Sequence, residues 1–99
     1  MKLPLYNIRA KVWLYKGEGP WHFVTIEKNI AKEIKKEYAL PRRGFGSIPV
    51  KVTVGSSSWK TSIFPDKTGV YLLPLKKEVR RMENIKIGYS INLSLEIFV

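Results

Sequence analysis

The sequence contains no cysteine and no glutamine, and it has a single histidine. The absence of cysteine excludes a disulfide framework, a thiolate nucleophile and a cysteine-ligated metal site, and it fits a cytoplasmic protein. No apolar run reaches the ~20 residues that span a bilayer, and residues 1–5 do not lead into the apolar stretch of a secretion signal. We therefore expect a soluble, cytoplasmic protein. The missing glutamine, with abundant lysine, glutamate and isoleucine, is typical of a thermophile.

Groups that carry out catalysis are scarce. His22 lies between Trp21 and Phe23 on an expected strand, where a lone histidine is usually structural or exposed. Ser62 and the serines at 56–58 offer hydroxyls, with Lys60 as a conceivable base, but turn propensity after a glycine explains the serine run. No metal triad is present, and the carboxylates lie in separate elements without a pairing spacing: Glu18, Glu27, Asp66 and Glu96. We expect no enzymatic activity and no cofactor.

One small unit is written twice, near residues 5–54 and near 58–97, as two strands, a short helix and a third strand. Alternating apolar and polar residues predict the strands of the first copy at 6–14, 21–26 and 48–54. Pro49 places the start of the third strand at an edge or at a break in pairing.

Each copy also contains a helix with one apolar face. In the first copy, apolar residues recur every four positions until Pro41 ends the helix: Ile26, Ile30, Ile34 and Tyr38. In the second copy, Leu75, Val79 and Met82 mark one face, and lysines and arginines occupy the other. Both patterns predict short helices that lie against the strands.

The strands of the second copy are predicted at 59–64, 70–73 and 89–97. The turn 65–69 has proline and glycine where a hairpin turn needs them, and Pro74 ends the return strand. Six strands with half-polar outer faces fit a small closed or split barrel, because closure removes exposed sheet edges. We predict a single domain over residues 1–99, mainly β, with six strands and two short helices.

Two resemblances follow from these motifs. Residues 69–81, GVYLLPLKKEVRR, and the following Ile85-Lys86-Ile87-Gly88 resemble the strand, proline, helix, basic pair and glycine turn of the AbrB and MazE type, whose members are dimers of such units. Nearly the whole chain resembles domain-of-unknown-function family nineteen-oh-five, through Val12-Trp13, Gly46-Ser47-Ile48-Pro49-Val50, Trp59-Lys60-Thr61-Ser62 and the segment 71–80.

The resemblance implies a double-split β-barrel, in which one polypeptide does what two AbrB-like subunits do together. It implies no activity. Tyr89 departs from the pattern, because both families usually place an aspartate after the glycine. Any turn-capping or charge which that acid supplies is therefore absent or replaced in this chain.

Charge is the strongest functional signal. Eighteen Lys and Arg against eight Asp and Glu give a net charge of +10. The excess is concentrated, with six basic and two acidic residues over 28–43, and five and two over 76–86. A field of this sign attracts nucleic acid, anionic lipid headgroups and acidic proteins. Lysines that simply solvate two helices would give the same pattern.

Eight basic residues are candidates for phosphate contacts. Arg42 and Arg43 could grip a phosphate bidentately, although a solvated loop with one arginine paired to Glu33 or Glu37 explains them as well. Strand alternation places Lys51 and Lys60 outward, where they would form a basic groove if the sheets bring them to Lys76. Arg80 and Arg81 point about 100° apart on a helix. The full set is Arg42, Arg43, Lys51, Lys60, Lys76, Lys77, Arg80 and Arg81.

Exposed aromatic rings could stack on the bases of a single strand. Trp13 falls on the polar side of its strand and is the candidate for stacking, although a helix that covers this face would make it a packing residue. Trp21 and Trp59 fall with the apolar residues and are expected in the core.

Three hypotheses remain open. The first is a non-enzymatic module that binds nucleic acid or another polyanion by phosphate contacts, without strong sequence preference. The second is an antitoxin-like or accessory protein-interaction module, which would use a strand edge or the apolar end Ile97-Phe98-Val99. The third is a binder of a small anion in the cleft between the two halves. A monomer or weak homodimer is expected in each case.

Overall fold

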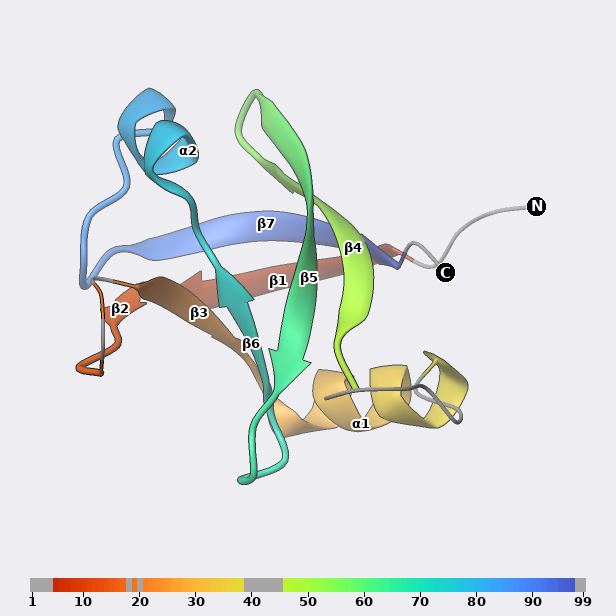
Figure 1. The fold of residues 1–99 in the computed structure, drawn as a ribbon. Helices are drawn as coiled ribbons and strands as arrows, with labels where there is room; N and C mark the ends of the chain where they lie inside the picture. The colour runs from red at the N-terminus through yellow and green to blue at the C-terminus, as the bar shows by residue number, and fades with distance from the viewer. Residues whose placement is uncertain (1–4, 18, 20, 39–45, 98–99) are drawn as a thin grey trace.

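The computed structural model describes residues 5–17, 19, 21–38 and 46–97, and its strands wrap into a nearly closed antiparallel barrel (Figure 1). In chain order the elements are β1 (Leu5–Lys11), β2 (Trp13–Leu14), β3 (His22–Ile26), α1 (Lys28–Tyr38), β4 (Ile48–Val54), β5 (Ser57–Pro65), β6 (Tyr71–Pro74), α2 (Lys77–Met82) and β7 (Ser90–Ile97). The neighbours in the sheet follow the order β1-β7-β4-β5-β6-β3-β2. The predicted mainly β, double-split barrel of two β-β-α-β units is confirmed.

The structure has seven strands where the sequence predicted six. The predicted strand 6–14 divides at Val12 into β1, which pairs with β7, and β2, which pairs with β3. Val12 leaves the ladder because its N–H donates to the carbonyl of Tyr89 at 2.9 Å and its own carbonyl accepts from the N–H of Gly88 at 2.8 Å. The chain therefore passes from one end of the strand order to the other at Val12.

The change of partner at Val12 also ends the predicted alternation. Leu14 was expected on the buried face, but it is exposed, whereas Ile8 and Val12 are buried as predicted. The pairing of a strand with its partner decides which of its residues face the core. Because β2 pairs with β3 and not with β7, the alternation of β1 does not continue into β2.

Strand β4 pairs with β5 on one side and with β7 on the other, and it has the predicted bounds. Its β-branched residues alternate into the core, which suits a pleated surface packed on one side. Pro49 pairs with Ser62 of β5, whereas the pairing with β7 begins at Val50. The proline thus precedes the second ladder, as a residue without an N–H donor requires.

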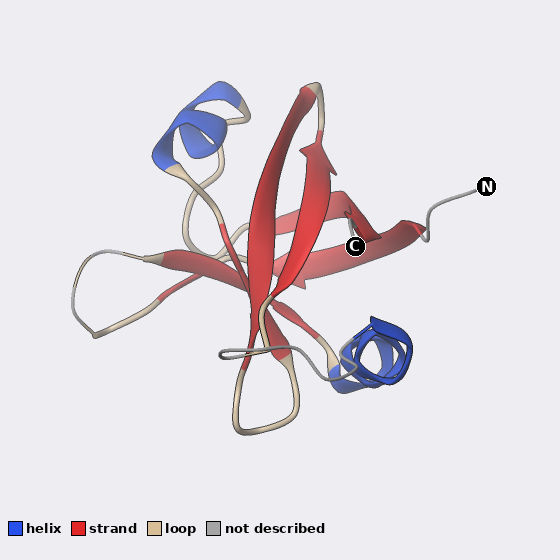
Figure 2. Cartoon of the chain, turned by 45° about the vertical axis from the view of Figure 1, so that its right-hand side comes forward, coloured by secondary structure: helices blue, strands red, loops and turns tan. Residues whose placement is uncertain are grey.

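The two helices lie on opposite sides of the strands (Figure 2). Helix α1 buries Ala31 and Ile34 and exposes its lysines. Helix α2 buries Val79, and Leu75 is buried just before it. Met82 was predicted on the same apolar face, but it is 71% exposed, because it sits in the last turn of a six-residue helix.

The turn before β7 is closed by backbone groups. The N–H of Tyr89 donates to the carbonyl of Lys86 at 3.0 Å, and Gly88 between them has a φ of 91°, a conformation that glycine adopts without strain. Tyr89 itself is exposed. The turn therefore forms here without the aspartate that the family resemblance leads one to expect.

Candidate functional site

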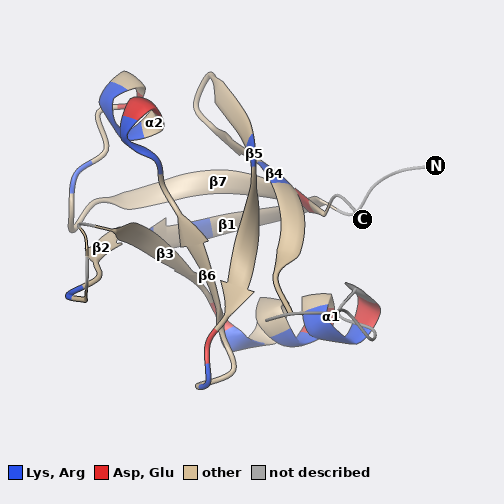
Figure 3. Cartoon of the chain, viewed as in Figure 1, with Lys and Arg blue, Asp and Glu red and all other residues tan. Residues whose placement is uncertain are grey.

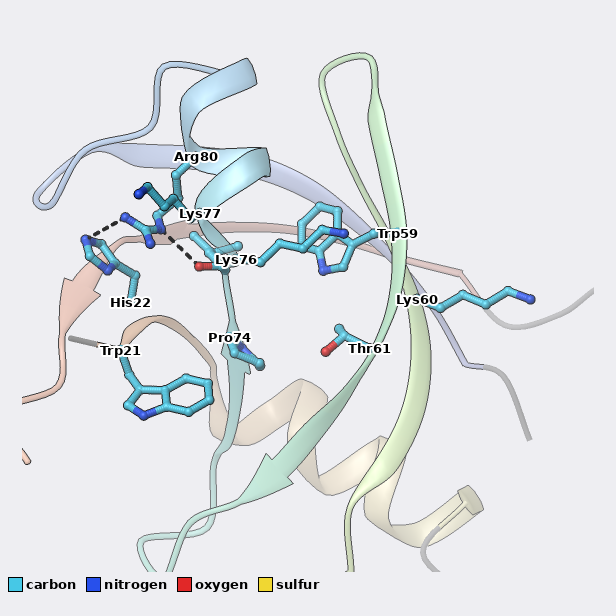
Figure 4. A pocket seen from close by; sticks show the side chains of 10 residues that line it. Trp21, His22, Trp59, Lys60, Thr61, Pro74, Lys76, Lys77 and Arg80 are labelled. Carbon is cyan, nitrogen blue, oxygen red and sulfur yellow. Dashed lines mark hydrogen bonds between the residues drawn. The ribbon is translucent and has the colours of Figure 1, made fainter. Parts of the chain in front are cut away.

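A cleft separates β5 from the segment that joins β6 to α2. Strands β5 and β6 pair at only two positions, Phe64↔Leu72 and Pro65↔Tyr71, and then diverge. The space between them has a volume of about 340 Å³. We call it the basic cleft (Figure 4). Its lining residues are Trp21, His22, Trp59, Lys60, Thr61, Pro74, Leu75, Lys76, Lys77 and Arg80.

Lysine and arginine residues lie on both helices and on the segment leading into α2 (Figure 3). Of the eight predicted phosphate contacts, Lys60, Lys76, Lys77 and Arg80 line the basic cleft. Arg42 and Arg43 lie outside the described residues. Lys51 and Arg81 are exposed but are not among the residues that line the cleft.

The two strand lysines share one cross-strand position. Lys51 of β4 stands opposite Lys60 of β5, and on its other side it stands opposite Glu96 of β7. Lys60 borders the basic cleft, but its side chain extends away from the helix side of the cleft in Figure 4. The side chain of Lys76, the residue just before α2, extends toward Trp59, whereas that of Lys77 points to the side where Arg80 and His22 lie (Figure 4).

Arg80 is held in a fixed orientation. Its Nε donates to the carbonyl of Leu75 at 3.1 Å, and its Nη1 lies 3.3 Å from Nε2 of His22. Since arginine has only donors, His22 accepts through Nε2 and carries its proton on Nδ1. The other N–H groups of the guanidinium have no hydrogen-bond partner among the described residues, so they are available to an anion.

Lys76 and Lys77 directly follow Leu75, whose carbonyl accepts the hydrogen bond from Arg80. The carbonyl of His22 accepts from the N–H of Leu75 at 2.9 Å, which ties β3 to the start of α2. Lys76 lies 3.7 Å from the carboxylate of Glu78, and half of its side chain is exposed. Exposed pairs of this kind are weak, so the ammonium of Lys76 can exchange Glu78 for a phosphate.

The three tryptophans differ in their surroundings. Trp59 is 8% exposed, as predicted for a core residue. Trp13, the predicted stacking residue, is half-buried, and its indole N–H donates to Oγ1 of Thr25 at 2.9 Å. Trp21 was predicted in the core, but it is 53% exposed, because β3 begins one residue later and Trp21 lies outside the sheet.

Trp21 belongs to a second hollow as well as to the basic cleft. We call this second hollow, of about 420 Å³, the aromatic surface; it is lined by Tyr15, Trp21, Phe23, Phe64, Asp66 and Leu72. Sequence reasoning missed it because these residues come from four separate segments. The one available signal was a run of aromatic residues on either side of the turn 16–20.

The serine hydroxyls of the 56–58 run have hydrogen-bond partners. Ser57 donates to Oε2 of Glu83 at 2.6 Å, and the hydroxyls of Ser58 and Thr53 are 2.8 Å apart. Within the described residues, no group of three or more His, Asp or Glu side chains is placed to hold a metal ion.

One carboxylate has a shifted acidity. The pKa of Asp66 is lowered from its ordinary value of 3.8, chiefly because the Thr68 hydroxyl donates to it, and also because the Thr68 N–H does. The two distances are 2.6 Å and 3.2 Å. These contacts close the turn between β5 and β6, so the carboxylate has a turn-forming role.

The apolar end proposed for protein contacts is partly enclosed. Ile97 is fully buried and stands opposite Val50 in the sheet. Phe98 and Val99 lie outside the described residues. Ile97 is therefore a core residue and does not provide an exposed contact.

Comparison with known proteins gives one family. The family described as "Domain of unknown function (DUF1905)" matches residues 9–95. No curated protein matches the chain. The matched range runs from within β1 to within β7, so it includes the basic cleft and the aromatic surface. In the part of the chain that the structure describes, neither helix has the length and apolarity to cross a membrane.

Proposed function

Since the chain belongs to the DUF1905 family of domains of unknown function, we propose its function from the chemistry of its surface: it is a non-enzymatic module that binds nucleic acid, or another polyanion, by phosphate contacts in the basic cleft. The observation that carries this proposal is that Lys76, Lys77 and Arg80 all line one open cleft. Residues that lie far apart in the sequence, Trp21 and Lys60, complete its walls.

The positive charge of the chain and of the cleft favours a polyanion as the ligand. The net charge is +10, and the nearest acid that pairs with a cleft lysine, Glu78, is itself mostly exposed. A cleft with cations on its walls concentrates the field and raises the rate at which a polyanion is captured. Arg80 adds a planar guanidinium whose orientation is set by Leu75 and His22, and a preoriented guanidinium suits bidentate contact with phosphate.

We also propose that the protein is not an enzyme. His22 accepts a hydrogen bond from Arg80, and the hydroxyls of Ser57 and Ser58 are engaged with Glu83 and Thr53. These contacts give each group a structural role. A cytoplasmic location and a monomeric or weakly dimeric state are parts of the same proposal.

The test is fluorescence anisotropy with labelled single-stranded and double-stranded DNA and RNA, measured as salt is raised from about 50 to about 200 mM. If the single strand makes three phosphate contacts, this increase in salt should lower its affinity about 20-fold. The double variant Lys76→Glu with Lys77→Glu should bind at least about tenfold more weakly than the natural chain at the lower salt concentration.

The matched control is Lys28→Glu with Lys32→Glu. These two lysines are exposed on α1 and line a different hollow with Lys35 and Thr68, so the control changes the net charge equally without touching the cleft. An equal loss of affinity in both double variants would show that only the net charge matters. No salt-dependent binding of any probe would refute the function.

A further inference from the structure

The arrangement of Trp21 points to the kind of nucleic acid that the cleft takes. Trp21 lines both the basic cleft and the aromatic surface, so a flat exposed ring lies beside the cations. In Figure 4, the indole of Trp21 lies across from Thr61 and below His22 and Arg80. Phosphate contacts and a stacking contact are therefore available within one cleft.

The ring of Trp21 is supported from one side. It stacks on Phe23 with ring centroids 6.0 Å apart and an interplanar angle of 7°. Phe23 in turn contacts Tyr15 edge-on at 6.0 Å and Trp13 at 5.4 Å. Trp13 is fixed by its hydrogen bond to Thr25. A ring held in this way loses little freedom when a ligand stacks on it.

Trp21 and the cations are also tied to one another through the backbone. His22, the next residue, accepts the N–H of Leu75 through its carbonyl and the guanidinium of Arg80 through Nε2. These two contacts fix the start of α2, with Lys76 and Lys77, against the start of β3. The fold therefore sets the separation between the backbone that carries Trp21 and the backbone that carries Lys76 and Lys77.

A duplex cannot use this arrangement, because its bases are already stacked on one another. A single strand can place a base on an exposed ring while its backbone follows a basic groove, and such stacking raises affinity about 5- to 150-fold per base. We propose that the ligand of the basic cleft is single-stranded nucleic acid, with one base stacked on Trp21 and the adjoining phosphates on Lys76, Lys77 and Arg80. This inference rests on the proposed function, and the high positive charge favours this occupant over an apolar peptide.

The test compares three labelled probes of equal length: oligothymidylate, an abasic strand with the same number of phosphates, and a DNA duplex. Trp21→Ala should lower the affinity for oligothymidylate at least about fivefold and leave the other two unchanged. Trp21→Phe, which keeps a ring against Phe23, should recover part of the loss. Binding of oligothymidylate should quench tryptophan fluorescence in the natural chain and much less in Trp21→Phe.

Tyr89→Ala is the control, because Tyr89 is exposed to a similar degree and lies outside both hollows; it should bind all probes normally. If all three probes bind with salt dependence but Trp21→Ala has no selective effect on oligothymidylate, the stacking proposal is wrong and the polyanion function stands. If no probe binds, both fail. A self-association that Trp21→Ala abolishes, with no probe selectivity, would assign the aromatic surface to a second copy of the chain and overturn the proposal.

Discussion

The hydroxyl of Ser57 donates a 2.6 Å hydrogen bond to Oε2 of Glu83, and this contact joins the start of β5 to the end of α2. Residues 59–61 of β5 and residues 74–77 with Arg80 line the basic cleft, and Figure 1 shows the tip of the β4–β5 hairpin standing opposite α2. At the other end of the cleft, β5 and β6 are joined by Phe64↔Leu72 and Pro65↔Tyr71. The cleft is therefore tied at both ends.

The first prediction concerns the hydrogen bond between Ser57 and Glu83. Ser57→Ala and Glu83→Ala should each lower the free energy of unfolding by about 1–2 kcal/mol, because each removes a partly buried hydrogen bond to a charged acceptor. Urea denaturation measures both values, and the double variant should lose less than their sum. Ser56→Ala is the control, since Ser56 is exposed and 3.4 Å from the same oxygen, and its loss should stay within about 0.5 kcal/mol. Additive single losses would contradict a direct contact.

The second prediction concerns the hairpin tip. Gly55 has a φ of 57°, and a Cβ at this position would collide with the carboxylate of Glu83. Because Ser57 holds this carboxylate, moving it aside also costs a hydrogen bond, so Gly55→Ala should cost more than the ~1 kcal/mol expected for alanine at a positive φ alone. Thermal or urea unfolding checks this value.

Gly88→Ala is the matched control for Gly55. Gly88 has a φ of 91°, and a Cβ there would meet no atom within 4 Å, so only the backbone cost applies. In a Glu83→Ala background, the cost of Gly55→Ala should fall towards that of Gly88→Ala. An unchanged cost would mean that the carboxylate is not the obstacle.

The third prediction concerns acidity. Because hydrogen bonds from Thr68 lower the pKa of Asp66 below 3.8, ionised Asp66 stabilises the folded chain. This stabilisation is complete at pH values above 3.8 and is lost as the pH falls through the lowered pKa. Carboxyl NMR titration should give a midpoint below 3.8, and Thr68→Val should raise it. A midpoint that does not respond to Thr68→Val would exclude the hydroxyl as the main cause.

The fourth prediction concerns Arg80. Arg80→Lys keeps the charge but removes the planar group that bonds both Leu75 and His22. The affinity for oligothymidylate should fall about three- to tenfold, because an ammonium lacks the fixed fork. Lys32→Arg also keeps the charge of its side chain and should leave the affinity nearly unchanged, since Lys32 is exposed on α1 and does not line the basic cleft. Equal affinities of the two variants would contradict an oriented role for Arg80.

Local patterns predicted the parts of the fold that depend on local chemistry. The alternation of β-branched residues gave the bounds of β4, and the spacing of Ile30 and Ile34 located α1. The break at Val12 could not be predicted, because the apolar alternation continues through it and the change of partner strand is decided by Gly88 and Tyr89, far along the chain.

In the candidate site, too, the features that depend on local sequence were predicted and those that depend on distant contacts were not. Charge clustering identified Lys76, Lys77 and Arg80, because they lie within one short segment. Trp21 was assigned to the core, because its exposure depends on β3 starting one residue later and on Phe23 holding its ring. Trp13 was preferred for stacking, because alternation cannot detect its hydrogen bond to Thr25.

The hydrogen bond between Ser57 and Glu83 affects how a polymer can enter the cleft. A cleft that is joined at both ends and open along its side admits a polymer laterally, so the ligand needs no free end to enter. Under the proposed function, a covalently closed circle of single-stranded DNA should bind as tightly as the linear strand of the same sequence. The protein would then recognise internal stretches of a chain wherever they become unpaired.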